Sequence, residues 1–117
     1  MDDCLFCRIV RGEIPAKVVY EDAHVIAFDD LAPQAPVHTL IIPRTHYANL
    51  NDDIPAPELA AIFSAVKRVA EVKGVKESGY RAIVNSGPDS NQTVKHLHVH
   101  VMGGQPLAHG MVTFADR

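Results

Sequence analysis

The hydrophobic positions of the chain form several short β-type runs separated by polar turns. Residues 17–22 and 24–30 are two neighbouring runs of this kind, which predicts a hairpin. Residues 37–43 and 79–85 predict two further strands, and the first of these is apolar almost without interruption from Thr39 onward. A continuous apolar run is typical of a strand covered on both faces, so residues 37–43 are expected near the centre of a sheet.

Two other stretches repeat their apolar residues at helical spacing. Residues 5–13 form a short pattern that is closed by Gly12 and Pro15. Residues 56–74 form a long one, and Pro57 suits its start. The apolar face of the long pattern consists of Leu59, Ile62, Phe63, Val66, Val69 and Ala70. The succession of helix, strands, long helix and strands predicts an α+β fold, in which a mostly antiparallel five-stranded sheet is covered by one long and one short helix.

The fifth strand is predicted at residues 96–104, where histidines alternate with aliphatic residues before two glycines. A polar stretch rich in turn-forming residues, 86–95, precedes this strand and predicts a loop. Beyond it, residues 111–114 could form one more short strand. No repeat or linker interrupts the pattern, so residues 1–117 are expected to form a single domain.

Composition and charge narrow the classes of function. The formal net charge of −3 and the lack of a basic run argue against a nucleic-acid partner. No apolar stretch approaches the ~20 residues of a membrane span, and the N-terminal segment lacks the order of a secretion signal. We therefore expect a cytoplasmic protein without a membrane partner. Seven histidines in a chain of 117 residues are unusual and direct attention to the sites.

The alternating histidines His96, His98 and His100 are the most informative pattern. In a strand they share one face, and the aliphatic residues between them form a core face on the other side. Neighbours on one face lie roughly 6.5–7 Å apart, which is poorly suited to sharing one metal ion bound at about 2.1 Å. A neutral imidazole is a nucleophile at neutral pH, and a second one beside it can face a phosphate. Together with the polar loop, the pattern indicates phosphoryl or nucleotidyl transfer; the alternative is a histidine-rich exposed strand face.

A second pattern, C-x-x-C, is formed by Cys4 and Cys7. In a reducing compartment this spacing is compatible with half of a zinc site, with a redox pair, or with two buried thiols. A tetrahedral zinc site would need two more ligands. The spacing alone leaves these alternatives open.

The segment "HLHVHVM" (96–102) resembles the signature of the histidine triad (HIT) superfamily and fills each of its positions. Residues 4–46, which include "PQAPVHTLIIP" (33–43), resemble the N-terminal half of the Hint branch, the nucleoside phosphoramidate hydrolases. Residues 84–104 resemble its C-terminal half. The resemblance implies a HIT-like fold and an enzyme that cleaves purine nucleoside 5′-phosphoramidates or aminoacyl adenylates through a nucleotidyl-histidine intermediate.

The resemblance also implies roles for single residues. His98 would be the nucleophile, and His100 would stabilise charge or donate a proton beside the phosphate. His38 would orient or polarise His98, although a partly buried histidine with satisfied hydrogen bonds is the alternative. The phosphate loop matches at Asn85, Gln92 and Thr93. Asn91 stands where animal members have glycine, and asparagine tolerates the left-handed backbone conformation.

The nucleoside end is implied in the same way. Asp30 matches the aspartate that binds the ribose hydroxyls, since a carboxylate can accept from both of them. The apolar purine pocket matches at Leu5, Phe6, Ile9, Ile14, Phe28 and Leu31, each of which could equally be ordinary core. Asp29 replaces a histidine seen in some relatives, which leaves the base preference open.

Bacterial-type members of the branch complete a metal site around the two cysteines. The resemblance therefore implies a structural Zn²⁺ ion held by Cys4, Cys7, His46 and His96, which would fix the N-terminal helix beside the purine pocket. Animal relatives lack the cysteines, so no catalytic metal is expected.

The resemblance further implies a homodimer. The long helix has a second face of small residues, Ala60, Ala61, Ser64 and Ala65, which could pack on a partner or be simply exposed. Two other functions compete with phosphoramidate hydrolysis: the splitting of dinucleoside polyphosphates, and nucleotide binding by a scaffold whose catalysis is vestigial. His24 and His109 match no site and are expected at the surface.

Overall fold

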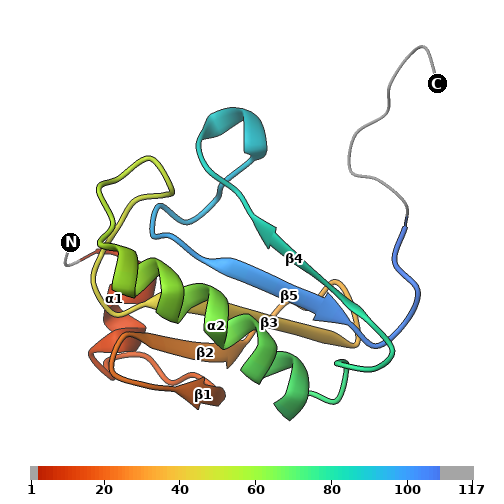
Figure 1. The fold of residues 1–117 in the computed structure, drawn as a ribbon. Helices are drawn as coiled ribbons and strands as arrows, with labels where there is room; N and C mark the ends of the chain where they lie inside the picture. Colours follow the sequence, from red (N-terminus) through yellow and green to blue (C-terminus); the bar gives the residue numbers. More distant parts are fainter. Residues whose placement is uncertain (1–2, 109–117) are drawn as a thin grey trace.

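The computed structural model describes residues 3–108, which build one five-stranded sheet with two α-helices and a short 3₁₀ helix (Figure 1). In chain order the elements are α1 (Leu5–Val10), β1 (Val18–Glu21), β2 (Val25–Asp29), β3 (Val37–Pro43), α2 (Ala56–Val72), β4 (Tyr80–Val84), η1 (Pro88–Ser90) and β5 (Val99–Gly103). The strands lie in the order β1-β2-β3-β5-β4, and each neighbouring pair is antiparallel. The predicted α+β class and the central position of β3 are confirmed.

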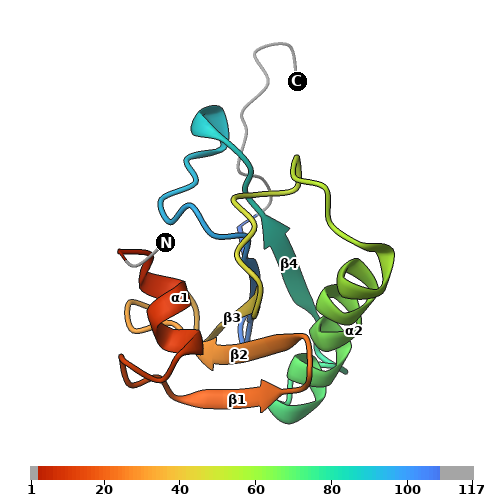
Figure 2. The same ribbon diagram turned by 90° about the vertical axis from the view of Figure 1, so that its left-hand side faces the viewer.

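The long helix α2 covers one face of the sheet and closes the main hydrophobic core (Figure 2). Its buried residues pack against alternate residues of the inner strands and of the segment that leads into β5. This core consists of Val25, Ala27, Ile41, Ile62, Ala65, Val66, Val69, Leu97, Val99 and Val101. The aliphatic half of the histidine alternation is therefore core, as predicted.

The short helix α1 lies on the opposite face and forms a second, smaller apolar cluster. The cluster consists of Phe6, Ile9, Ile26, Phe28, Leu40 and Ile42. Helices shorter than ~12 residues are marginal in isolation, so the six residues of α1 depend on this packing and on contacts at its N-terminus. Because α1 is so short, it leaves part of this face open.

The strand register brings the histidines of β3 and β5 to this open face. Leu40 of β3 lies opposite His100 of β5, and His38 lies opposite Met102. Side chains two residues apart share a face, so His38 points to the same side as Leu40, next to His100. The functional histidines and α1 thus occupy one side of the sheet, and α2 occupies the other.

The start of β5 differs from the prediction. The strand begins at Val99 rather than at residue 96, so His96 and His98 lie in an irregular segment just before it. The Leu97 N–H donates to the Tyr47 carbonyl at 2.6 Å, and the His96 carbonyl accepts from the His98 ring. These backbone groups are therefore not available for pairing with a neighbouring strand.

Two predictions for the long helix are wrong in detail. Phe63, expected on the apolar face, is 47% exposed, whereas Ala65, expected on a second face, belongs to the core. A helix advances about 100° per residue, so the buried stripe that runs through Ile62 and Val69 takes in position 65 and leaves position 63 outside. The helix ends at Val72, and Gly74 follows with a φ of +73°.

The remaining expectations concern the surface and the tail. His24 is exposed, as predicted. His109 and the strand expected at 111–114 lie outside the described residues. Within residues 3–108, no helix combines the length and the apolar character needed to cross a membrane.

Candidate active site and metal centre

His98 is buried just before β5, and its ring makes a T-shaped contact with the Phe6 ring. Its Nδ1 lies 2.7 Å from the backbone carbonyl oxygen of His96, and a carbonyl can only accept, so Nδ1 carries a proton and donates. The Nε2 atom of the neutral ring therefore holds the lone pair. Burial lowers the pKa of His98, which keeps the ring uncharged and nucleophilic at neutral pH.

His38 and His100 form a directed hydrogen-bonded pair beside His98. The Gln34 backbone N–H donates to Nδ1 of His38 at 3.1 Å, so the proton of neutral His38 is on Nε2. This Nε2–H donates to Nδ1 of His100 at 2.9 Å. The proton of neutral His100 is consequently on its own Nε2. Burial lowers the pKa of His100 to about 4, so at neutral pH the free protein presents it as an uncharged N–H donor.

Asp30, directly after β2, completes this cluster. Its Oδ2 lies 3.5 Å from Nε2 of His38, and its Oδ1 accepts the Ala32 N–H at 2.9 Å. Asp30, His38 and His100 are close enough together to hold a metal ion. However, Nδ1 of His38 accepts from Gln34 and Nε2 carries the proton, so His38 has no free lone pair for a metal. We interpret this group as a hydrogen-bonded cluster.

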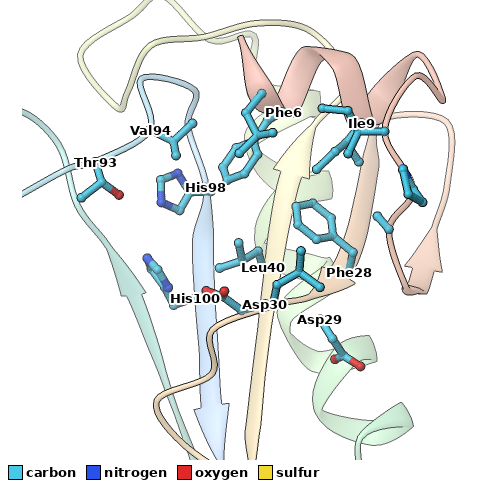
Figure 3. Close-up of a pocket in the computed structure, with 15 residues that line it drawn as sticks. Phe6, Ile9, Phe28, Asp29, Asp30, Leu40, Thr93, Val94, His98 and His100 are labelled. Carbon is cyan, nitrogen blue, oxygen red and sulfur yellow. The ribbon is translucent and has the colours of Figure 1, made fainter.

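An apolar pocket of about 270 Å³ opens between α1, β2 and the histidines (Figure 3). All six residues predicted for the purine pocket line it: Leu5, Phe6, Ile9, Ile14, Phe28 and Leu31. Phe6, Ile9 and Phe28 are buried, while Leu31 is 92% exposed and Leu5 44% exposed, so these two form its rim. The polar end of the pocket is formed by Asp30, Thr93, His98 and His100.

The Asp29 side chain does not contribute to this polar end. Its carboxylate accepts from the Thr39 hydroxyl at 2.9 Å and pairs with the Lys73 ammonium at 3.0 Å, at the end of α2. Figure 3 shows the carboxylate directed away from the other labelled pocket residues. The replacement of histidine by Asp29 therefore places no carboxylate against a base in the pocket.

A second, polar hollow of about 550 Å³ lies against the same histidines. Its lining includes Gln34, Asn85, Asp89, Ser90, Asn91 and Met102. It shares Thr93, His98 and His100 with the apolar pocket. The two histidines thus lie between an apolar and a polar cavity, an arrangement that suits a phosphate with a flat ring system on one side and a polar group on the other.

The predicted phosphate loop is held together by the Gln92 side chain. Its Oε1 accepts the Gly87 N–H at 3.0 Å, and its Nε2 donates to the carbonyls of Ala48 at 2.7 Å and Val94 at 3.0 Å. Asn91 adopts the left-handed conformation, with a φ of 63°, as the sequence suggested. Gln92 therefore braces the loop, and its direct contact with substrate stays a prediction.

The four residues predicted as zinc ligands come together at the start of α1, with all donor atoms within 4.8 Å of one another. Nδ1 of His96 lies 3.4 Å from Sγ of Cys4, and Nδ1 of His46 lies 3.3 Å from Sγ of Cys7. The two ring nitrogens are 3.2 Å apart. A tetrahedral zinc ion bound at about 2.3 Å to sulfur and about 2.05 Å to nitrogen requires N···N and S···N separations of roughly 3.3–3.6 Å. The observed separations fit such an ion.

Protonation at this centre also suits a metal. The Nε2–H of buried His96 donates to the Pro43 carbonyl at 2.9 Å, so Nδ1 turns its lone pair toward the thiols. Burial lowers the pKa of His96 to about 4. Burial and the neighbouring Cys4 raise the pKa of the Cys7 thiol, a cost that a divalent cation offsets by binding the thiolate. Sulfur and nitrogen donors in this ratio are those that Zn²⁺ prefers.

Some residues of the site were missed at the level of sequence. Leu40 and Val94 also line the apolar pocket. Leu40 could have been found from the alternation along β3, because it shares a face with His38. The Gln34 N–H and the Pro43 carbonyl are backbone groups, and no pattern of side chains marks them.

The antiparallel sheet, the alternating histidines and the two adjoining cavities define a histidine-triad class of protein. Residues 11–107 match the HIT domain family. The chain is 41% identical over 108 residues to the purine nucleoside phosphoramidase of Escherichia coli (strain K12), covering 91% of each chain. A match of this extent shows that the chain belongs to the HIT family.

Solved structures agree with this assignment. A HIT family hydrolase from Clostridium thermocellum has a TM-score of 0.91 and 43% identity, covering 96% of this chain and 99% of that one. A HIT family hydrolase from Legionella pneumophila Philadelphia 1 has a TM-score of 0.86 and 44% identity, covering 91% of this chain and 96% of that one. These relatives support the assignment of the chain to the hydrolases of the HIT family.

Proposed function

We propose that the protein hydrolyses purine nucleoside 5′-phosphoramidates or aminoacyl adenylates through a nucleotidyl intermediate on His98. The observation that carries this proposal is the fixed lone pair of His98. Its Nδ1 is held by the His96 carbonyl, which leaves Nε2 as the nucleophilic atom of a ring that borders both cavities. The purine nucleoside phosphoramidase relative supports cleavage of a P–N bond.

The first step forms the intermediate. Nε2 of His98 attacks the α-phosphorus, a bond from phosphorus to the ring forms, and the bond to the leaving amine or carboxylate breaks. A leaving amine takes up one proton from the solvent, which is returned when water reacts in the second step. The ring, now carrying a proton on Nδ1 and phosphorus on Nε2, becomes cationic, and the His96 carbonyl stabilises this charge by accepting from Nδ1–H.

The second step releases the nucleotide. Water attacks the phosphorus, the bond to the His98 ring breaks, and one proton of the water is released. His98 returns to the neutral form with its proton on Nδ1. The Nε2–H of His100 and the Thr93 hydroxyl, which border both cavities, can donate to the phosphate oxygens in both steps. Asn85 lies in the polar hollow, where the leaving group would be.

The nucleoside would occupy the apolar pocket. A purine ring suits the buried aromatic and aliphatic floor made by Phe6, Ile9 and Phe28. Asp30 lies between this pocket and the histidines, where its carboxylate can accept from the two ribose hydroxyls. The substrate is thus held at both ends of the reacting phosphate.

The decisive experiment compares His98→Ala with His24→Ala, a histidine exposed between β1 and β2. Hydrolysis of adenosine 5′-phosphoramidate and binding of AMP are measured for both. We expect His98→Ala to retain AMP binding and to lose at least about a thousandfold in kcat, since it lacks the nucleophile. Undiminished hydrolysis by His98→Ala would remove His98 as nucleophile.

The same assay separates the competing functions. Faster turnover of a diadenosine polyphosphate than of the phosphoramidate would favour the dinucleoside polyphosphate alternative. AMP binding without turnover of either compound by the unaltered protein would favour a nucleotide-binding scaffold.

The second part of the proposal is a structural zinc ion on Cys4, Cys7, His46 and His96. The donor separations and the orientation of His96 support it. The ligands come from α1 and the residue before it, from the segment after β3 and from the segment before β5. An ion there would tie the short helix, and with it one wall of the purine pocket, to the sheet.

The third part is a homodimer. Phe63 is 47% exposed on the outer side of α2, near the small exposed residues Ala60 and Ser64. Burying this surface against a second copy would remove a large aromatic side chain from water. Light scattering of the protein as it elutes from a size-exclusion column should give twice the mass of one chain. Phe63→Glu should shift the measured mass toward that of a single chain. A protein with the mass of a single chain would contradict the dimer.

A further inference from the structure

The loop between β2 and β3 places one backbone group against the histidine cluster. The Gln34 N–H donates to Nδ1 of His38 at 3.1 Å, and Nε2 of His38 lies 2.9 Å from Nδ1 of His100. His38 is buried, so water does not compete for these bonds. We propose that the Gln34 N–H is a positioning group that selects the tautomer of His38, and thereby directs the N–H of His100 toward the phosphate of the substrate.

The physical reason is that a neutral imidazole carries only one proton. With Gln34 donating to Nδ1, His38 must hold its proton on Nε2 and donate to His100. His100 accepts at Nδ1, so its proton is on the outer nitrogen, Nε2. One backbone N–H thus fixes the positions of two ring protons in succession.

The opposite tautomer would reverse the contact with substrate. A proton on Nδ1 of His38 would face the Gln34 N–H, which puts two donors against each other. Nε2 of His38 would then accept, His100 would carry its proton on Nδ1, and its Nε2 would present a lone pair to a negatively charged phosphate oxygen. An attraction worth a charge-assisted hydrogen bond would become a repulsion.

The loop itself holds Gln34 in place. Asp30 accepts the Ala32 N–H at Oδ1, and the Asp30 N–H donates to the His38 carbonyl, each at 2.9 Å. Prolines one residue before and two residues after Gln34 restrict the backbone further. The Asp30 carboxylate, 3.5 Å from Nε2 of His38, favours a proton on that nitrogen as well. The Gln34 N–H at Nδ1 and the Asp30 carboxylate near Nε2 therefore both favour the tautomer of His38 that carries its proton on Nε2.

The test removes the N–H without removing the residue. Gln34→Pro lacks the backbone donor, whereas the matched variant Gln34→Ala keeps it and loses only the side chain, which lines the polar hollow. Long-range ¹H–¹⁵N NMR spectra of the histidine rings report which nitrogen carries the proton. We expect the Nε2–H tautomer of His38 in the unaltered protein and in Gln34→Ala, and a mixture or the Nδ1–H tautomer in Gln34→Pro.

Two results would overturn the proposal. One is an Nδ1–H tautomer of His38 in the unaltered protein, a measurement that does not depend on the folding of any variant. The other is a Gln34→Pro protein that melts cooperatively and keeps the Nε2–H tautomer, which would leave Asp30 as sufficient. If Gln34→Pro does not fold, the His38 tautomer measured in the unaltered protein is the test of the proposal.

The catalytic consequence rests on the proposed function. We expect kcat/KM for adenosine 5′-phosphoramidate to be about tenfold to a hundredfold lower in Gln34→Pro than in Gln34→Ala, the loss of one hydrogen bond to a charged group. If the unaltered protein does not turn the compound over, the proposed function fails while the tautomer result still stands. If turnover is equal in the two variants although the tautomer differs, the role of Gln34 fails and the proposed function stands.

Discussion

The two faces of the sheet are built from the same strands but serve different ends. On the α2 face, neighbouring strands contribute aliphatic residues that a long helix covers completely. On the α1 face, the alternate residues of the same strands are histidines and pocket residues, and a six-residue helix leaves them partly open. Because side chains alternate along a strand, β5 supplies both faces at once: Val99 and Val101 pack under α2, and His100 faces the other side.

The difference shows how a small protein tolerates buried polar groups. Among the described residues, each buried side-chain nitrogen or oxygen has a hydrogen-bond partner. His38, His96 and His98 find theirs in backbone groups, and His100 finds its partner in the His38 ring. The α2 face is almost purely apolar. Its burial stabilises the fold and so offsets the cost of the buried polar groups on the α1 face.

Metal removal should have the largest effect, and it should act on one face. Chelation of zinc, or Cys4→Ser, is expected to lower stability by several kcal/mol, because metal binding contributes directly to the free energy of folding. Hydrogen exchange should show loss of protection in α1 while α2 retains it. Metal analysis that finds no zinc in the gently purified protein, with stability unchanged in Cys4→Ser, would contradict the metal assignment.

Ile41→Ala should affect the other face. Ile41 is fully buried under α2, so its truncation is expected to cost about 2–5 kcal/mol in urea unfolding. The kcat of the folded fraction should change little, because the side chain points away from the histidines. A large loss of kcat without loss of stability would show that the two faces are not separable in this way.

Low pH should lower the free energy of unfolding through the histidines of the α1 face. The pKa of His100 is lowered to about 4 by burial, whereas the unfolded chain protonates histidine near ~6.5. Between these values the unfolded state binds the additional proton, so stability falls as pH falls from about 6.5 to 4 and is undiminished above that range. His100→Gln should make this loss smaller, as measured by urea unfolding at several pH values; an unaltered slope would contradict it.

Asp29→Asn should have the smallest effect and sharpen the division between the faces. The carboxylate pairs with Lys73 on the α2 side, and its loss is expected to cost about 1 kcal/mol or less. The ratio of kcat/KM for adenosine and guanosine phosphoramidates should stay the same, because the carboxylate is directed away from the pocket. A changed ratio would place Asp29 in base recognition.

Much of the fold could be predicted from the sequence, because the spacing of hydrophobic residues within a short segment indicates whether that segment forms a helix or a strand. The strands, the two helices and the central position of β3 follow from spacing alone. Predictions that depend on helix orientation were less accurate: Phe63 was placed inside and Ala65 outside, since apolarity does not show which edge of a stripe meets the sheet. The start of β5 was misplaced because Tyr47, distant in sequence, takes the Leu97 N–H.

The candidate site divides in the same way. The sequence itself determined which side chains are available: three alternating histidines, two cysteines, a polar loop and an apolar stripe. Only the tertiary structure decided what each of them does, because the state of a histidine depends on its hydrogen-bond partners. The partners that fix His38, His96 and His98 are backbone groups, which every sequence contains and whose positions are set only when the chain has folded.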